Sequence, residues 1–187
     1  MRSYIDYEKA RNPIYSIIRD FIIKNKVRTV LDVGCGPGRL LDDIHDICAA
    51  EGLDSSEDLL QRCREKGYKV RKGNAIGLPY KDLAFDLVVA KDLVEHVADN
   101  VRLVRELKRV AKKFIFLSAV GPVPEFAWGD YTHLRPYTKR ALQLLVADQG
   151  LQILSVGSVK RQWPFRVLAR LYFQPVDDIS VYVFAKK

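Results

Sequence analysis

Short apolar runs alternate along this chain with longer segments in which apolar residues recur at helical spacing. The runs at 29–33 and 85–90 are compact and rich in valine, leucine and phenylalanine, which is typical of strands buried inside a sheet. Similar but less uniform runs predict five further strands, at about 47–53, 68–71, 114–120, 151–159 and 179–185.

The segments between these runs have the helical period. At 7–24, isoleucine and phenylalanine recur every three or four residues, which predicts a helix. A second helix is expected to begin at Pro37, and a third after Ser55, which with Asp58 forms a capping-box-like start. Two more are expected, one ending at the lysines 112 and 113 and one running from Thr138 to Gly150.

Strands that alternate with helices in this way indicate an α/β protein. We expect a doubly wound, Rossmann-like and mostly parallel sheet with helices on both faces. The last two strands have no obvious helix between them, so we also expect an antiparallel edge strand. The 187 residues suit one domain over 1–187, with a helical segment at 1–27 ahead of the first strand.

The first strand runs into a loop with glycine at every second position, at 34, 36 and 38. Glycine lets the backbone turn tightly and approach a ligand closely, and the helix that follows offers free N–H groups and its positive dipole end. In an open α/β sheet, ligands bind at this edge. A dinucleotide loop would carry its third glycine where Arg39 stands, and the Gly-Lys-Ser/Thr ending of a P-loop is absent.

The pattern Asp32-x-Gly34-x-Gly36-x-Gly38 resembles motif I of the class I S-adenosylmethionine-dependent methyltransferases, and the segment 133–138 resembles the branch named methyltransferase type 11. The likeness extends over about 29–159. It implies the class I methyltransferase fold, S-adenosyl-L-methionine as cofactor and S-adenosyl-L-homocysteine as product. The implied cofactor-binding residues are Asp32, Gly34, Cys35, Gly36, Gly38, Asp54, Ser55, Asn74, Ala75 and Lys91.

Three of these residues have an alternative interpretation. In the family, the position of Asp54 binds the ribose hydroxyls, which suits a carboxylate, but the residue can also serve as a helix cap. Asn74 matches the family's adenine-edge position and is equally a common turn residue. Asp32 lies near the cofactor's methionine end in the family, and can also hold the loop through backbone hydrogen bonds.

Methyl transfer requires alignment of the acceptor and exclusion of water, and a general base only when the acceptor must lose a proton. His133 and His96 are the candidate catalytic bases, and Tyr137 is the candidate that ranks after them. His133 lies in an aromatic-rich stretch at 119–137, which we expect to be an insertion that covers the substrate as a lid. A histidine there could instead only orient its neighbours. Tyr4, Tyr7 and Tyr15 near the N-terminus are candidates for an aromatic cover over the cofactor, and ordinary helix packing is the alternative.

Composition bounds the partners and the compartment. With 31 basic and 23 acidic residues the net charge is +8, and the basic residues concentrate at 62–72, 102–113 and 160–170. Such surfaces can bind nucleic acid, although solvated helix faces give the same pattern. The three cysteines lack C-x-x-C spacing, so we expect neither disulfides nor a metal site. No apolar run reaches the length of about 18 residues that a membrane span needs, and the N-terminus is unlike a signal peptide, so we expect a cytoplasmic protein.

These features predict a methyltransferase with an unidentified, small-molecule acceptor. An RNA or protein methyltransferase that uses the basic surface is the alternative within the same class. A cofactor-binding partner subunit without catalysis is the alternative from another class. No feature of the sequence indicates an oligomeric state or identifies the acceptor atom.

Overall fold

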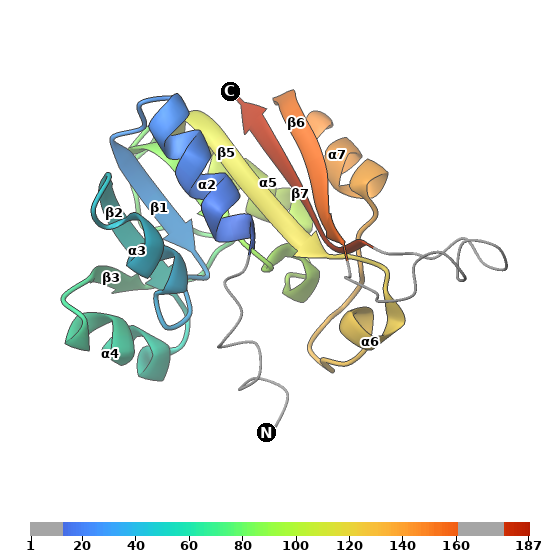
Figure 1. The fold of residues 1–187 in the computed structure, drawn as a ribbon, viewed down its shortest axis with the longest axis horizontal. Coiled ribbons are helices and arrows are strands. Elements are labelled where there is room, and N and C mark those ends of the chain that lie inside the picture. The colour runs from blue at the N-terminus through green and yellow to red at the C-terminus, as the bar shows by residue number, and fades with distance from the viewer. Residues whose placement is uncertain (1–12, 161–177) are drawn as a thin grey trace, which may run out of the picture.

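The computed structural model describes residues 13–160 and 178–187, which form a seven-stranded sheet with helices on both faces (Figure 1). The strand order is β3-β2-β1-β4-β5-β7-β6. Strands β3, β2, β1, β4 and β5 are parallel, whereas β7 is antiparallel to both of its neighbours, β5 and β6. The strands are β1 Thr29–Val33, β2 Ala49–Asp54, β3 Lys69–Lys72, β4 Phe85–Ala90, β5 Ala111–Val120, β6 Gln152–Lys160 and β7 Asp178–Lys186.

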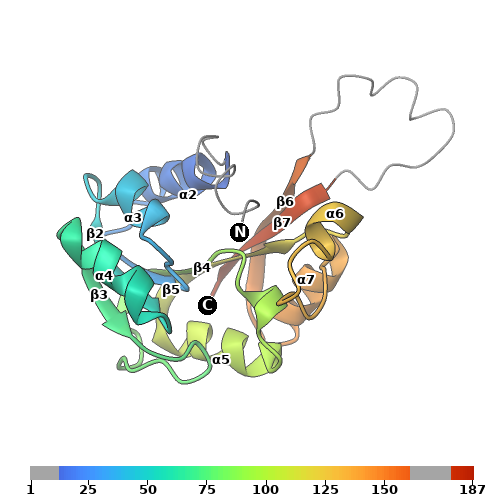
Figure 2. The ribbon, with the colours of Figure 1, turned by 90° about the horizontal axis from the view of Figure 1, so that it is seen from below.

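The helices fill the connections between these strands. They are α2 Pro13–Lys24, α3 Arg39–Ile44, α4 Glu57–Glu65, α5 Asn100–Val110, α6 Pro124–Ala127 and α7 Lys139–Ala147, with a single 3-10 turn, η1, at Val94–His96. Figure 2 shows α2 and α3 on one side of the sheet and α5 and α7 on the other. Within the described residues, no helix is both long and apolar enough to cross a membrane.

Strand β4 shows how the sheet is buried on both sides. Leu87 and Val89 pack with α2 and α3, while Val88 and Ala90 pack with α5 and α7. All four side chains are fully buried. Because neighbouring residues of a strand point to opposite faces, a strand covered on both faces has apolar residues at consecutive positions. This is the physical origin of the continuous apolar run in the sequence.

The predicted α/β fold with a mostly parallel sheet is confirmed. Antiparallel pairing occurs at the predicted edge, where β7 lies one strand in and β6 forms the edge itself. The strands at 29–33 and 85–90 have the predicted bounds, and the hydroxyl of Thr138 caps α7 by accepting from the amide of Ala141. Residues 7–12 of the predicted first helix lie outside the described part of the chain.

Several local predictions were wrong. The second helix, predicted to begin at Pro37, begins at Arg39, because Gly38 before it has a left-handed φ of 83°. Helix α7 ends at Ala147, before the predicted end at Gly150. The second strand begins at Ala49, because the amides of Ile47 and Cys48 bond back to the carbonyl of Ile44 and close the end of α3. Helix α5 ends at Val110, and the lysines at 112 and 113 belong to β5. Ser55 forms no capping box: the N-cap of α4 is Ser56, without a side-chain cap.

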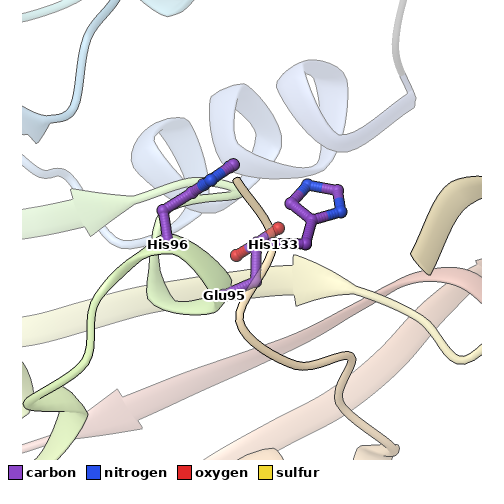
Figure 3. A group of neighbouring side chains, drawn as sticks. All are labelled: Glu95, His96 and His133. Atoms are coloured by element: carbon purple, nitrogen blue, oxygen red, sulfur yellow. The ribbon is translucent and has the colours of Figure 1, made fainter. Parts of the chain in front are cut away.

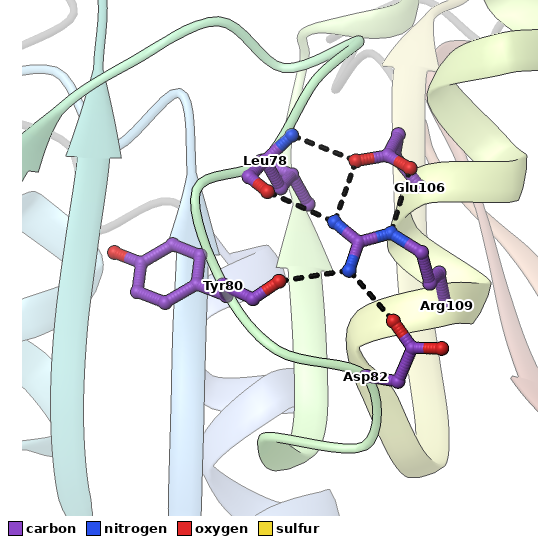
Figure 4. Close-up of polar contacts among 5 residues, drawn as sticks. All are labelled: Leu78, Tyr80, Asp82, Glu106 and Arg109. Atoms are coloured by element: carbon purple, nitrogen blue, oxygen red, sulfur yellow. Dashed lines mark hydrogen bonds and ion pairs between the residues drawn. The ribbon is translucent and has the colours of Figure 1, made fainter.

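The loop between β3 and β4 is fixed to α5 by one guanidinium group (Figure 4). Arg109 donates to the carbonyls of Leu78 and Tyr80 at 2.9 and 2.8 Å, and to the carboxylates of Asp82 and Glu106 at 2.8 Å each. Glu106 in turn accepts from the amide of Leu78 at 2.7 Å. Backbone groups of a loop without a strand partner are thereby satisfied by a side chain.

Candidate active site

A cavity of about 650 Å³ lies at the carboxyl ends of β1, β4 and β5, where an open α/β sheet binds its ligands. The glycine loop and the start of α3 form one wall, and η1, α6 and the segment around His133 form the opposite one. Pro13 and Tyr15 of α2 complete the lining with the ends of β5, β6 and β7. The volume is within the range of pockets that hold small molecules, about 300–1,000 Å³.

The glycines of the loop have separate structural reasons. All three have positive φ, at 76°, 52° and 83° for Gly34, Gly36 and Gly38. A Cβ on Gly36 would face open space, so this residue leaves room above the loop for a ligand. A Cβ on Gly38 would meet the Sγ of Cys63 at 3.0 Å, so this glycine permits packing against α4 and does not line the cavity.

Asp54 connects the loop after β1 with the loop after β2. Its carboxylate accepts from the amide of Gly36 at 2.9 Å and from the amide of Ser56 at 2.9 Å. It lies outside the cavity lining, one hydrogen bond away from it through Gly36. Each carboxylate oxygen retains a lone pair, so the group can still accept bonds from two neighbouring hydroxyls. Ser55 lies beside it and makes no cap.

Asn74 is exposed and holds a turn, since its side-chain oxygen accepts from the amide of Ile76 at 3.1 Å. The neighbouring amide of Gly73 bonds to the carbonyl of Asp54, which brings this loop to the same edge of the sheet. Neither Asn74 nor Ala75 lines the cavity. The geometry therefore shows the turn role and leaves the adenine role as a prediction.

Two opposite charges lie in the cavity wall at the ends of β1 and β4. Asp32 is 3% exposed, and burial raises the pKa of its carboxyl to about 7, a rise that the charge of Lys91 opposes and that of Asp54 increases. Lys91 bonds to Asp92 at 2.5 Å and lies 5.1 Å from the ring centre of Tyr15. Burial lowers the pKa of Lys91, but the charge of Asp92 outweighs this and raises it overall. The ammonium is thus charged at all ordinary pH values.

Cys35 lines the cavity but is a packing residue. Its side chain is 6% exposed and lies against Gly52, where an added Cβ would approach the Sγ to 2.7 Å. Burial strongly raises the pKa of the thiol, and Asp32 raises it further. Because the thiolate is the reactive form of cysteine, this environment makes Cys35 chemically inert.

The two histidines predicted as catalytic residues come together at the cavity wall. The rings of His96 and His133 are 4.7 Å apart, centre to centre. Burial and the nearby His133 lower the pKa of His96, which is therefore neutral at physiological pH. Tyr137, the third candidate base, is instead a buried anchor: its hydroxyl accepts from Asn100 and Arg135, both at 2.9 Å.

The stretch 119–137, predicted to cover the substrate, begins inside β5 and contains α6. The amide of Tyr137 bonds to the carbonyl of Val120 and closes the base of this stretch, while the amide of Leu134 bonds to the carbonyl of Glu95. Phe126 and His133 from this stretch line the cavity. Its role as a lid remains a prediction.

Glu95 lines the cavity, although no role was predicted for it from the sequence. It is 1% exposed, and burial raises the pKa of its carboxyl to about 8, with a further rise from the charge of Asp92. One carboxylate oxygen accepts from the amide of Val120 at 2.8 Å. Its position next to His96 was visible in the sequence, but its burial depends on packing against β5.

Comparison with known proteins agrees with this architecture. Residues 31–115 match the family model described as "Methyltransferase domain". The chain is 31% identical over 170 residues to norajmaline N-methyltransferase from Rauvolfia serpentina, covering 83% of this chain and 54% of that protein. It is 30% identical over 122 residues to tRNA (carboxymethyluridine(34)-5-O)-methyltransferase alkbh8 from Xenopus tropicalis, covering 61% of this chain and 19% of that protein.

Among solved structures, a SAM-dependent methyltransferase from Archaeoglobus fulgidus has a similar fold, with a TM-score of 0.75 and 22% identity over 99% of this chain and 100% of that one. The chain spans about half of the length of norajmaline N-methyltransferase and about a fifth of the length of the tRNA methyltransferase. The similarity therefore does not assign the activity of either relative to this chain. The matched domain, the relatives and the sheet show that the chain belongs to the class I S-adenosylmethionine-dependent methyltransferases.

Proposed function

We propose that this protein transfers the methyl group of S-adenosyl-L-methionine to a small-molecule acceptor held in the cavity. The observation that carries the proposal is the continuity of this cavity from the glycine loop to the paired histidines. Cofactor and acceptor can therefore occupy one space, next to each other. When bound, the cofactor supplies a methyl group already activated on a sulfonium sulfur.

The residues at the glycine loop fit this cofactor. The open space above Gly36 accommodates a ligand against the backbone. The amino-acid end of S-adenosylmethionine carries one ammonium and one carboxylate group, and Asp32 and Lys91 offer the complementary charges in the cavity wall. Asp54 would hold the ribose hydroxyls through its remaining lone pairs. Asn74 and Ala75 would meet the adenine from the adjacent loop.

The opposite wall would hold the acceptor. Phe126 covers the cavity and helps to exclude water, and His96 and His133 can orient the acceptor or accept its proton. A small acceptor is supported by the cavity volume of about 650 Å³. A second support is that many basic side chains form ion pairs within the molecule and are therefore less available to bind RNA. Lys66 pairs with Asp42, for example, and Lys69 with Glu51.

RNA is the second candidate acceptor. The net charge of +8 and the likeness to proteins named as tRNA methyltransferases favour it. Methylation of a mixed RNA pool, with binding that weakens steeply as salt is added, would replace the small-molecule proposal with this one.

Cofactor binding is the first test. At a ligand concentration about 100 times Kd, S-adenosylhomocysteine should stabilise the fold by about 2.7 kcal/mol, which corresponds to a melting shift of about 5–10 °C. Asp54→Asn should reduce the shift, whereas Asp58→Asn on the exposed side of α4 should leave it unchanged. No shift with either S-adenosylmethionine or S-adenosylhomocysteine, together with a clear shift with NAD, would refute the proposal.

A further inference from the structure

Glu95, His96 and His133 gather at the acceptor wall of the cavity (Figure 3). One ligand atom from each residue lies within 4.8 Å of the other two. Glu95 and His96 come from η1, directly after β4, whereas His133 comes from the segment after α6. The fold thus brings His133 next to Glu95 and His96, which lie far from it in the sequence.

The hydrogen bonds of the imidazoles fix which nitrogen of each is available. Nδ1 of His133 lies 3.0 Å from the carbonyl oxygen of Ala127, and a carbonyl can only accept, so this nitrogen carries the proton. Nδ1 of His96 lies 2.9 Å from the hydroxyl of Thr132, which donates its own proton to Asp130 at 2.6 Å. That hydroxyl therefore accepts from His96.

In both rings, the lone pair is consequently on Nε2. A ring whose Nδ1–H donates to an oxygen while Nε2 is left to coordinate is the usual arrangement of a metal-binding histidine, because the outer hydrogen bond fixes both tautomer and orientation.

The carboxylate supplies an independent observation. Oε1 of Glu95 accepts from the amide of Val120, but Oε2 is buried and has no hydrogen-bond partner within the part of the chain that the structure describes. The whole residue is 1% exposed. A buried oxygen without a partner is costly, and a cation beside it would remove that cost.

We propose that Glu95, His96 and His133 bind one divalent transition-metal ion, of which Zn²⁺ is the best match to two nitrogen ligands and one oxygen ligand. Three protein ligands leave a coordination position open. That position would face the cavity, where an oxygen of the acceptor could occupy it and lose its proton more readily. Ligands of a tetrahedral zinc ion are about 3.3 Å apart, so the rings would rotate inward when the ion binds.

Only the role of the ion in activating an acceptor depends on the proposed methyl transfer. Binding of the ion itself can be measured on the chain alone, without cofactor or acceptor. The experiment uses the complete chain without a histidine tag, freed of metal with a chelator. Zn²⁺ binding is measured by calorimetry, and Co²⁺ is used as a spectroscopic probe of coordination number.

We expect one ion per chain, with a Co²⁺ spectrum of four or five ligands. His96→Ala and His133→Ala should each raise Kd more than 100-fold. Thr132→Val keeps all three ligands but removes the outer hydrogen bond of His96, together with the bond from Thr132 to Asp130, and should raise Kd by about 10–100-fold. Glu95→Gln should also weaken binding, although Oε1 of the amide can still accept from Val120. His45→Ala is the matched control, because His45 is the third histidine of the chain and lies at the end of α3, outside the cavity.

Circular dichroism and S-adenosylhomocysteine binding establish that each variant is folded. Absence of Zn²⁺ binding to the folded wild-type chain would overturn the proposal. Binding that persists unchanged in both His96→Ala and His133→Ala would overturn it as well, since the ion would then be held elsewhere, for example by cysteine. If the folded wild-type chain binds Zn²⁺ but not S-adenosylhomocysteine, the proposed function is contradicted and the metal site is not.

Discussion

The buried carboxyl of Asp32 should make the fold less stable as the pH rises. Its pKa is about 7 in the folded chain, because burial disfavours the charged form, the charge of Asp54 adds to this, and Lys91 only partly opposes it. In the unfolded chain the group ionises near 3.8. Between these two values the folded state binds more protons than the unfolded state, so the free energy of unfolding falls from about pH 4 to about pH 7.

The size of this effect follows from the two pKa values. The pKa of Asp32 is about three higher in the folded chain than in the unfolded chain. At about 1.36 kcal/mol for each pKa unit, this corresponds to a change of about 4 kcal/mol in the free energy of unfolding. Asp32→Asn keeps the shape of the side chain and is neutral at every pH. The variant should therefore exceed the stability of the wild type by about 1 kcal/mol at pH 4.5 and by about 4 kcal/mol at pH 8, as measured by urea unfolding at a series of pH values.

Asp86 provides a control of opposite sign. Burial would raise the pKa of its carboxyl, but hydrogen bonds from the amides of Arg28 and Thr29 outweigh this and lower it. Asp86→Asn should accordingly destabilise the fold at neutral pH. A stability difference between Asp32→Asn and the wild type that stays constant from pH 5 to pH 8 would refute the reasoning.

Ligand binding offers a second measurement on the same group. If the ammonium of the cofactor lies against Asp32, binding must favour the carboxylate and release a proton near pH 6.5. Lys91, Asp54, Tyr15 and the thiols of Cys35 and Cys63 also interact with this carboxyl. Calorimetry in two buffers of different ionisation enthalpy measures the released proton, and Asp32→Asn should abolish it. Equal proton release by the variant would show that another group is responsible.

Two further predictions concern the loops around the cavity. Arg109→Met should lower the free energy of unfolding by about 3 kcal/mol, because it leaves two loop carbonyls and Glu106 without their donor. Urea unfolding measures this change. Arg105 is exposed, so Arg105→Met is the control and should change the free energy of unfolding by less than about 0.5 kcal/mol. Gly34→Ala should weaken S-adenosylhomocysteine binding about tenfold, because the new Cβ meets Leu93 at 3.1 Å in the cavity wall. Gly67→Ala has the same positive φ with open space around it, so it should cost similar stability and leave calorimetric binding unchanged; equal loss of binding in both variants would contradict the assigned contact.

The parts of the fold that were predictable are those in which a local pattern has one physical cause. The bounds of β1 and β4 were predictable because consecutive apolar residues, which pack against both faces of the sheet, make up most of each strand. The glycine loop was recognisable because few residues other than glycine adopt positive φ. The end of α5 was not predictable, since Val110 and Ala111 are both buried and the chain passes directly from helix to strand without a glycine or proline.

The site was predictable on one side only. Residues of the glycine loop follow one another in the chain, so their shared position needed no knowledge of packing. The carboxylate of Glu95 became part of the site through the burial that β5 imposes, and its pairing with His133 required the path of the chain through α6. Spacing rules for metal ligands consider neighbours in the sequence, and they therefore gave no indication of this group.

This division explains why the methyl donor is easier to infer than the acceptor. The donor wall is one continuous segment, from Asp32 to Leu40, with Lys91 added from the next strand. The acceptor wall combines η1, α6 and the segment around His133, whose positions relative to one another depend on a few hydrogen bonds such as that from Leu134 to Glu95. Substitutions in those segments can alter the acceptor side without disturbing the donor wall. Relatives named for norajmaline and for a tRNA are consistent with this separation. The acceptor of this chain should therefore be sought through the chemistry of the histidine side, where a bound metal ion would favour a molecule that offers an oxygen atom.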